Sequence, residues 1–325
     1  MTRRLSLSLV ALVACLALPM SAQASFKTGV SDQVPTSFLS PLYTSLGMST
    51  ARYIAPYDVM VLPKTDPDWI AMNAWITNAR QAGQDILISF EHSHTRGHEK
   101  RAPNAKEYAK DLKLFMRAFP FVRSISPWNE VNRCNRTIAG SSLVVGQPRT
   151  LCSLKKGPKL AASYYKVTRT TCAQLHRSCN IVALDILDQN NVSQAVRYTK
   201  AFRRYAKPAP KIWGIHNYSD TNRFSTKRTK ALLKATGKGQ IWLTETGGIV
   251  KFGRSFPFST SRAAKALGCM FTIAKSSSRI KRLYIYNFSP AQPESEFDAG
   301  LINTDGSKRP GWNVVKRRKA GRCHK

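Results

Sequence analysis

Two glutamates, each placed where a hydrophobic run ends, are the residues of this sequence whose type and position best suit chemistry. Glu130 follows the run at 121–125, and Glu245 follows the run at 240–243. Two carboxyl groups can hydrolyse a glycosidic bond when they flank it, one of them protonated and the other ionised. We therefore expect the two strand ends to face each other, with the rest of the chain acting as their scaffold.

The residues around each glutamate suit a different protonation state. Trp128 stands two residues before Glu130, and a carboxyl group that is shielded from water tends to keep its proton. Arg52 and Tyr218, if they reach Glu245, would hold that side chain in its ionised form. The sequence therefore favours Glu130 as the proton donor and Glu245 as the anionic partner.

The scaffold is an alternation of predicted strands and helices with no internal linker. Eight hydrophobic runs read as strands: 26–30, 50–54, 85–90, 121–125, 180–187, 211–215, 240–243 and 280–286. Helical patterns separate them, the first over 35–47 and the last over 312–318. This order predicts a (β/α)8 TIM barrel as a single domain over residues 25–325. A doubly wound open sheet is the alternative, but no glycine-rich phosphate loop follows the first strand.

Polar side chains stand at the ends of most of these strands, and barrel active sites lie on that face. The strand-end residues are Arg52, His92, Glu130, Asp188, His216, Tyr218, Glu245 and Tyr286. A single one would read as an ion-paired surface residue, whereas eight together indicate a site. Besides the two glutamates, we expect the substrate to be bound by Arg52, His92, Trp128, Asn129, His216, Tyr218 and Tyr286.

The motifs around both glutamates resemble those of clan A glycoside hydrolases. Trp128-Asn129-Glu130-Val131-Asn132 resembles the Asn-Glu motif that ends strand four in that clan, and Thr244-Glu245-Thr246-Gly247 resembles its nucleophile motif. Arg52 and Tyr218 match the arginine and tyrosine that support the nucleophile. The segment Ala299 to Pro310 is similar to the one that precedes the last helix in many members.

This resemblance implies a retaining mechanism on a TIM barrel. Glu130 would be the acid/base, Glu245 the nucleophile, and Asn129 would hydrogen-bond the 2-hydroxyl of the sugar. Val131 stands where the commonest version of the motif has proline, so no individual family is assigned.

The first 24 residues have the pattern of a secretory signal peptide. Arg3 and Arg4 precede an apolar run at 5–19, and Ala22-Gln23-Ala24 forms a small-residue cleavage site. A lipoprotein box ending at Cys15 is the alternative, although the sequence after that cysteine remains apolar. We expect a secreted, extracellular protein with no membrane span.

Six cysteines follow the signal peptide, as expected for disulfides in an exported chain. Sequence proximity favours Cys134–Cys152, Cys172–Cys179 and Cys269–Cys323, out of about fifteen possible connectivities. The first pair would pin a long loop at about 133–157, beside the predicted site.

The chain is strongly basic, with 51 lysines and arginines against 18 acidic residues and a formal charge of +33. Such an excess attracts polyanions of any kind: acidic polysaccharides, wall phosphate polymers, anionic membranes and nucleic acids. A solvated basic face with no ligand is the other interpretation. The partner that we expect is a carbohydrate substrate, including acidic or cell-wall-associated glycans, and no specific nucleic acid.

Two hypotheses from different classes follow. The first is a secreted retaining glycosidase that acts as a monomer, without a cofactor, on a polysaccharide or oligosaccharide. The second is a catalytically silent carbohydrate- or polyanion-binding protein on the same barrel. His92, His94 and His98 would form a metal site only with a further well-placed ligand. The sugar, its linkage and endo or exo action are not fixed by the sequence.

Overall fold

A computed structural model describes residues 26–134, 136–137, 144–189 and 191–324. The signal peptide expected at residues 1–24 lies outside the described residues, as does part of the loop expected at 133–157. In the described part of the chain, no helix is long and apolar enough to cross a membrane.

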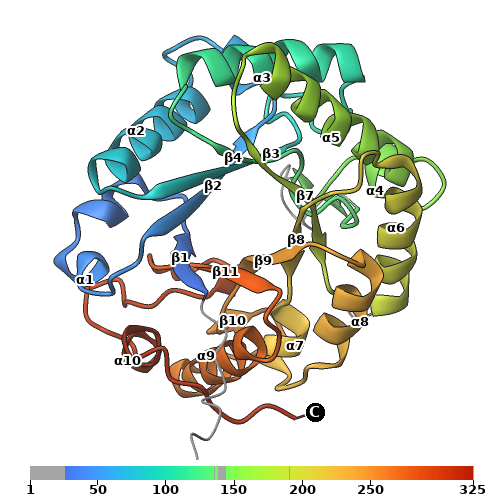
Figure 1. Ribbon diagram of the computed structural model, residues 1–325. Helices are drawn as coiled ribbons and strands as arrows, with labels where there is room; N and C mark the ends of the chain where they lie inside the picture. The colour runs from blue at the N-terminus through green and yellow to red at the C-terminus, as the bar shows by residue number, and fades with distance from the viewer. Residues whose placement is uncertain (1–25, 135, 138–143, 190, 325) are drawn as a thin grey trace, which may run out of the picture.

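Eight parallel strands form a closed barrel, which confirms the predicted TIM barrel (Figure 1). Around the barrel the order is β1-β11-β9-β8-β7-β4-β3-β2. The strands are β1 (Lys27–Ser31), β2 (Thr50–Pro56), β3 (Asp85–Glu91), β4 (Ser124–Ser126), β7 (Asn180–Leu187), β8 (Ile212–His216), β9 (Gln240–Thr246) and β11 (Ile280–Ile285). All eight match predicted strands, although β4 is shorter than the apolar run that predicted it.

Helices surround the barrel on all sides (Figure 1). The longer ones are α2 (Pro67–Gln81), α3 (Ala105–Ala118), α5 (Gly157–Gln174), α6 (Val192–Tyr205), α8 (Lys227–Thr236) and α9 (Thr260–Lys275), and the last is α10 (Pro310–Lys316). Asp66 and Asn104 cap α2 and α3, because their side chains accept hydrogen bonds from backbone N–H groups of the first turn. Shorter helices are α4 (Arg149–Cys152) and α7 (Tyr218–Asn222).

The single helix predicted over 35–47 is wrong. The chain forms a 3-10 helix, η1 (Pro35–Leu39), and then the one-turn helix α1 (Pro41–Thr44). Ser40 between them is extended, with φ −76° and ψ 125°. Proline at 41 explains the break, because it disfavours a helical conformation in the residue before it and supplies no N–H.

Two hydrophobic layers hold the barrel together. A large core fills the space between strands and helices, and a smaller cluster of strand side chains lies inside the barrel. The inner cluster comprises Leu87, Val182, Ile212, Trp242 and Tyr284. Each comes from a different strand, so this layer packs one end of the barrel and leaves the polar residues of the other end free for a site.

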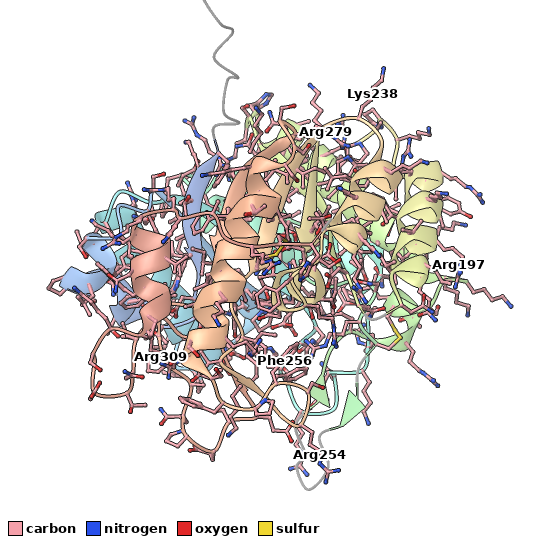
Figure 2. The ribbon with its side chains drawn as sticks, turned by 90° about the horizontal axis from the view of Figure 1, so that it is seen from below. Arg197, Lys238, Arg254, Phe256, Arg279 and Arg309 are labelled. Carbon is pink, nitrogen blue, oxygen red and sulfur yellow. A yellow bond between two sulfur atoms is a disulfide. The ribbon has the colours of Figure 1, made fainter. Side chains whose placement is uncertain are left out.

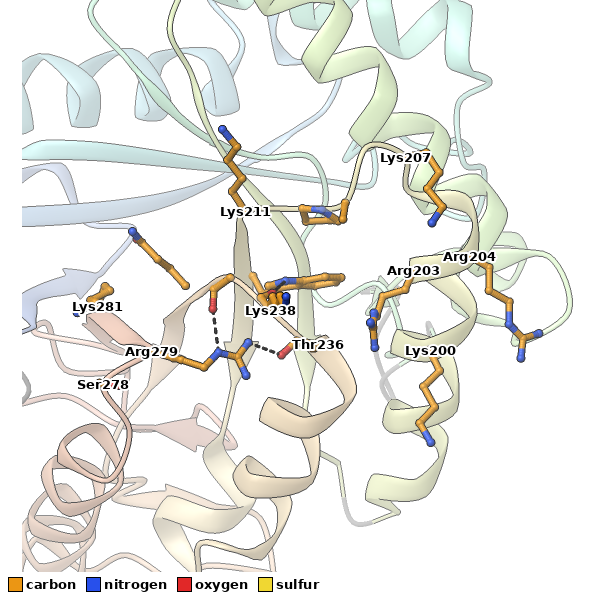
Figure 3. Close-up of a pocket in the computed structure, with 16 residues that line it drawn as sticks. Lys200, Arg203, Arg204, Lys207, Lys211, Thr236, Lys238, Ser278, Arg279 and Lys281 are labelled. Carbon is orange, nitrogen blue, oxygen red and sulfur yellow. Dashed lines mark hydrogen bonds between the residues drawn. The ribbon is translucent and has the colours of Figure 1, made fainter.

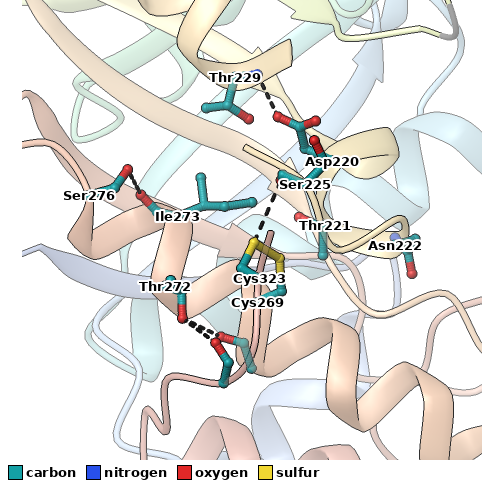
Figure 4. The surroundings of a disulfide bond; sticks show 12 residues. Asp220, Thr221, Asn222, Ser225, Thr229, Cys269, Thr272, Ile273, Ser276 and Cys323 are labelled. Carbon is teal, nitrogen blue, oxygen red and sulfur yellow. Dashed lines mark hydrogen bonds between the residues drawn. A yellow bond between two sulfur atoms is a disulfide. The ribbon is translucent and has the colours of Figure 1, made fainter. Parts of the chain in front are cut away.

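Three disulfides join the cysteine pairs that sequence proximity favoured: Cys134–Cys152, Cys172–Cys179 and Cys269–Cys323. The last fixes the C-terminal segment to α9 (Figure 4). Thr272 supports it by donating a hydrogen bond to the carbonyl of Gly321, at 2.6 Å. Gly268 and Gly321 lie so close that a Cβ on either would approach the other's Cα to 3.0 Å, so this crossing requires residues without side chains.

Two short antiparallel sheets of two strands each stand beyond the barrel. β5 (Arg136–Thr137) pairs with β6 (Val144–Val145) inside the disulfide-pinned loop, and β10 (Lys251–Phe252) pairs with β12 (Phe297–Asp298). The second sheet carries aromatic rings to the end of the barrel where the predicted site residues lie, because Phe252 and Phe297 line the same cavity as the two glutamates.

Candidate active site

The two glutamates lie beside each other, Glu130 in the loop after β4 and Glu245 on β9. One side-chain ligand atom each from Glu130, His216 and Glu245 lies within 4.8 Å of the other two. Both carboxyl groups are buried, with 5% and 6% of the residue exposed. The sequence expectation that these strand ends meet is therefore met by the fold.

Arg52 on β2 organises the Glu245 side of the site. Its Nη1 donates to Glu245 Oε1 at 2.6 Å, and its Nη2 donates to Asn129 Oδ1 at 2.8 Å and Asp185 Oδ2 at 2.9 Å. Burial opposes the charge of this fully buried guanidinium, but the carboxylates of Asp185 and Glu245 raise the pKa of Arg52 above its usual value. Arg52 is therefore a cation fixed beside Glu245 by hydrogen bonds on several sides.

Asp185 was not singled out in the sequence, although it lies at the centre of this network. It stands on β7 and accepts hydrogen bonds from Ser89 and Thr244 as well as from Arg52. Burial raises the pKa of Asp185, but the charge of Arg52 and these hydrogen bonds outweigh it, and the pKa is lowered. Position 214 on β8 must be glycine, since a Cβ there would lie 1.9 Å from the Asp185 carboxylate.

The Glu130 carboxylate is held by two cationic groups. Arg133 Nη1 donates to Oε2 at 2.8 Å, and His216 Nδ1 lies 3.1 Å from Oε1. Burial favours the neutral acid, but the charges of Arg133 and His216 outweigh it and lower the pKa of Glu130 to about 2. The backbone at Glu130 is left-handed, with φ 41°, a conformation that non-glycine residues adopt mainly where surrounding structure imposes it.

The expectation that Trp128 helps Glu130 to keep a proton is not met. Trp128 is 1% exposed, stacks on Tyr164 with ring centroids 5.0 Å apart, and donates its indole N–H to Gln147 at 2.7 Å. It lies outside the cavity lining and packs behind the site. Its position therefore suits a support for the loop that carries Glu130 rather than a surface on which a sugar stacks.

His216, at the end of β8, lies between the two glutamates. Its Nδ1 is 3.1 Å from Glu130 and 3.8 Å from Glu245, and its Nε2 is 3.9 Å from Asp185. Complete burial disfavours the imidazolium, but these carboxylates outweigh burial and raise the pKa of His216.

Tyr218 donates its hydroxyl to Glu245 Oε2 at 3.1 Å. It is the first residue of the five-residue helix α7, whose first-turn backbone N–H groups donate to Asp188, the residue after β7. The two Asp188 oxygens accept from Ser219 N at 3.1 Å and Asp220 N at 3.0 Å. Burial raises the pKa of Asp188 to about 7, although these N–H groups oppose the shift. Asp188 therefore positions the helix that holds Tyr218.

Above the glutamates is a cavity of about 1270 Å³. His92, Asn129, Tyr218 and Tyr286 line it, together with the two glutamates. Burial lowers the pKa of His92, which therefore faces the cavity as a neutral ring. Arg52 and His216 lie beneath the lining and reach the cavity only through the carboxylates that they contact.

Glu130, His216 and Glu245 are the group that could offer ligand atoms to a metal ion within the described residues. Arg52 and Arg133 already donate to their carboxylates at 2.6 and 2.8 Å. These cations neutralise the charge that a metal would otherwise balance, so the donor set fits an arginine-bound carboxylate pair better than a metal centre. His94, considered with His92 and His98, instead contacts Asp68 at 3.0 Å.

Arg133 is the second residue that the sequence did not single out. It lies three residues after Glu130, in the turn closed by the hydrogen bond from Arg133 N to the Glu130 carbonyl. The signal that could have identified Arg133 was its position as a basic residue directly after the Trp-Asn-Glu-Val-Asn motif. Asp185 had a comparable signal, because it is the only charged residue among the eight of β7.

A carboxylate pair at two strand ends of a closed eight-stranded barrel, with an arginine and a tyrosine on one member, is the arrangement that the structure shows. Solved structures that resemble this fold are clan A glycoside hydrolases of families 39, 5, 10 and 30. The resemblance to that clan is confirmed for the fold. No protein-family model and no curated protein sequence matches the chain.

Three of these structures illustrate the likeness. A family 10 endo-β-1,4-xylanase from a psychrophilic source aligns with a TM-score of 0.63 at 12% identity, over 90% of this chain and 96% of its own. A GH5_18 protein from Streptomyces cattleya, solved with GlcNAc, gives 0.63 at 13% identity, over 93% and 83%. A family 39 glycoside hydrolase from Bacteroides cellulosilyticus WH2 gives 0.61 at 14%, over 91% of this chain and 64% of its own.

Proposed function

We propose that this protein is a secreted retaining glycoside hydrolase, with Glu245 as nucleophile and Glu130 as acid/base. The observation that carries the proposal is the closeness of the two buried carboxylates, because one oxygen of each lies within 4.8 Å of an oxygen of the other. Retaining enzymes hold this pair about 5–5.5 Å apart, and inverting enzymes about 6.5–9.5 Å apart, to leave room for a water molecule. The known structures of similar fold add support, because they are glycoside hydrolases.

In the first step, the Glu245 carboxylate attacks the anomeric carbon and forms a covalent glycosyl ester. The bond from that carbon to the leaving oxygen breaks, and the oxygen takes its proton from Glu130. Arg52 and Tyr218 hold the attacking carboxylate in place with hydrogen bonds of 2.6 and 3.1 Å. Asn129, fixed through Arg52, presents its amide towards the sugar hydroxyl next to the reacting carbon.

In the second step, water attacks the anomeric carbon of the ester. Glu130, now ionised, accepts a proton from that water, and the bond to Glu245 breaks. The sugar leaves with its original anomeric configuration, and both glutamates return to their starting protonation states. The cations around Glu130 stabilise the ionised form that this step requires.

Glu130 must carry a proton when the first step begins, although Arg133 and His216 favour its ionised form in the free protein. Burial alone raises the pKa of Glu130. A substrate that displaces the half-exposed Arg133 side chain would remove the main opposing charge. The acid would then be protonated in the complex, where it is used.

The substrate is a glycan of more than one residue. The cavity of about 1270 Å³ exceeds the roughly 300–1,000 Å³ of typical small-molecule sites. The rings of Tyr218, Tyr286 and Phe297 stand close together at its wall, with centroids 5.8–6.4 Å apart. Such rings provide apolar faces against which sugars pack. Secretion is supported by the three disulfides, which persist in oxidising compartments.

The decisive test compares Glu130→Gln and Glu245→Gln with Glu99→Gln, a matched change at the wall of the same cavity. On a panel of polysaccharides, we expect each active-site variant to lose at least about 10²-fold in turnover, and the control to keep it. Each variant should retain the unfolding temperature of the parent. Binding to glycans without cleavage by any form of the protein would instead identify a silent binding barrel.

Azide separates the two roles. With Glu245→Ala, azide should restore turnover of an activated aryl glycoside and give a glycosyl azide of inverted configuration, because it takes the place of the missing nucleophile. With Glu130→Ala, the azide product should keep the configuration. Identical stereochemistry in both variants, read by proton NMR, contradicts the assignment.

A further inference from the structure

A second large cleft lies at the opposite end of the barrel from the glutamates. It has a volume of about 960 Å³ and is formed where β8, β9 and β11 begin and α6 ends. Figure 2 shows Lys238 and Arg279 at this end, whereas Phe256, which lines the active-site cavity, lies towards the other. The two clefts therefore do not share a wall.

The cleft is lined by eight cationic side chains and no acidic one (Figure 3). The exposed members are Lys200, Arg203, Arg204, Lys207, Lys211, Lys238 and Lys281, and Arg279 is partly buried. Among the ion pairs of the described residues, none involves any of these eight. Elsewhere the basic surface is interrupted by carboxylates, as at Arg101 and Glu107. The eight cationic side chains of the cleft differ, because among the described residues no ion pair with a carboxylate balances their charge.

Two of the arginines form the wall of the cleft. Arg279 donates to the carbonyls of Gly239 and Leu233 and to the Thr236 hydroxyl, at 2.7–3.0 Å. Burial lowers the pKa of Arg279, because none of these partners is charged. Arg203 donates to the carbonyl of Ala235 at 2.9 Å. The wall thus holds positive charge whose counter-ion has to come from outside the protein.

The lysines are the adaptable part of the cleft. Lys207, Lys211, Lys238 and Lys281 are exposed and contribute to the lining from different segments of the chain. Like charges gathered in this way repel one another, and a bound polyanion relieves that repulsion. Lysine ammonium groups act as point charges on flexible stems, which suits single negative charges at intervals better than a planar fork does.

We infer that this cleft binds an anionic polysaccharide, one that carries a carboxylate or phosphate on successive residues of its chain. Nucleic acid is the less suitable polyanion, because single strands bind through stacking on aromatic rings. Trp213 is the aromatic residue of the lining, and it is 2% exposed with its indole N–H bonded to the Lys238 carbonyl. This inference goes beyond the proposed function and does not depend on catalysis.

The test removes four charges in two different places. One variant changes Lys207, Lys211, Lys238 and Lys281 to Gln. The control variant changes the exposed Lys106, Lys110, Lys159 and Lys166 of α3 and α5 to Gln, so that both lose the same net charge. Binding is measured at about 50 mM salt to polygalacturonate, to a teichoic-acid-type polyol phosphate, to single-stranded DNA of equal charge number and to neutral dextran.

We expect the cleft variant to bind one or both anionic glycan-type polymers at least tenfold more weakly than the parent, and the control variant to lose less than threefold. The affected polymer shows whether carboxylate or phosphate is preferred, and dextran should not bind. Equal losses in the two variants would mean that binding depends only on the total charge of the protein, which would overturn the inference. Tighter binding of DNA through the same lysines would also overturn it, by assigning the cleft to nucleic acid.

Both variants are first compared with the parent by circular dichroism and thermal unfolding, so that a folding defect is not counted as lost binding. Repeating the measurement with Glu245→Gln excludes cleavage of the polymer during the assay. Retained binding by that variant with no turnover by the parent would count against the proposed function alone. Loss of binding only on changing the cleft, with turnover intact, supports the second site.

Discussion

Among single residues, Arg133 has the largest influence on the ionisation of the proposed acid. Its guanidinium lies 2.8 Å from Glu130 and comes from the same turn, and His216 contacts the other oxygen at 3.1 Å. Arg52 serves Glu245 in a comparable way but is fully buried and bound on several sides. One carboxylate is thus held by a fixed cation, and the other by a cation that can move.

Replacing Arg133 with Gln should move the alkaline limb of kcat/KM to higher pH. That limb follows the ionisation of Glu130 in the free enzyme. Arg133 favours the ionised form, so its removal raises the pKa of Glu130 and keeps the acid protonated to higher pH. An opposite charge at this distance shifts a carboxyl pKa by about 1–3 units, so we expect a shift of about one unit or more.

Arg96→Gln is the matched control, because Arg96 lines the same cavity and forms none of the ion pairs with Glu130. Its pH profile should superimpose on that of the parent. An alkaline limb that stays in place in Arg133→Gln, or moves to lower pH, would contradict the role given to Arg133.

The sequence predicted those site residues that reach the site because they stand at the ends of strands. Glu130, His216 and Glu245 follow apolar runs, and barrel geometry brings such positions together. It did not single out Asp185 and Arg133, because the direction of their side chains decides their roles. It also assigned Trp128 to the sugar, since a tryptophan next to a strand-end glutamate has the same sequence pattern whether it faces the cavity or the core.

At the scale of elements, α7 connects one strand end to the proposed nucleophile. This helix is too short to be stable alone, and its first turn is completed by Asp188 from β7. Asn222 at its other end donates to the carbonyl of Gly247, just beyond β9. Contacts from the segments that follow β7 and β9 therefore hold α7 in the position from which Tyr218 reaches Glu245.

Replacing Asp188 with Ala should destabilise the protein and lower activity together. The N–H groups of Ser219 and Asp220 would lose their acceptors, at a cost of about 1–3 kcal/mol for buried donors. Tyr218 would then be less well positioned on Glu245, so kcat should fall. Thermal unfolding and steady-state kinetics measure the two effects.

Asp188→Asn is the control, because it keeps one acceptor oxygen and nearly the same shape. It should recover most of the stability and activity. An Ala variant that loses activity while keeping its full stability would mean that Asp188 acts on the substrate rather than on α7.

The elements themselves were largely predictable from periodicity and end signals, such as Asp66 before α2 and Asn104 before α3. The helix expected over 35–47 does not form as one unit, because Pro41 interrupts it after Ser40. The small sheet of β10 and β12 was not predicted, since strands of two residues are too short to show a pattern.

At the scale of the whole molecule, the chain ends are fixed by different means. β1 pairs with β11 and closes the barrel, whereas the C-terminal segment is held on α9 by Cys269–Cys323, 54 residues apart (Figure 4). Cys172–Cys179 closes only 7 residues. The chain-entropy model assigns the longer loop the larger stabilisation, about 4 kcal/mol against about 2.5 kcal/mol.

Replacing Cys269 and Cys323 with Ser should therefore lower the free energy of unfolding more than replacing Cys172 and Cys179. Urea unfolding of the two double variants, under identical conditions, measures the difference directly. A smaller loss for the 269–323 pair would show that native contacts of the C-terminal segment, such as the Thr272–Gly321 hydrogen bond, compensate for the missing bond.

Because all eight barrel strands run in the same direction, the basic cleft and the two glutamates lie at opposite poles of one axis. If the protein bound a polyanionic layer through its basic cleft, the cavity that holds the two glutamates would face away from that layer. The protein would then process glycans that arrive from solution and spare the layer that holds it. Raising the salt concentration should accordingly release the protein from such a layer while leaving turnover of a small uncharged glycoside unchanged.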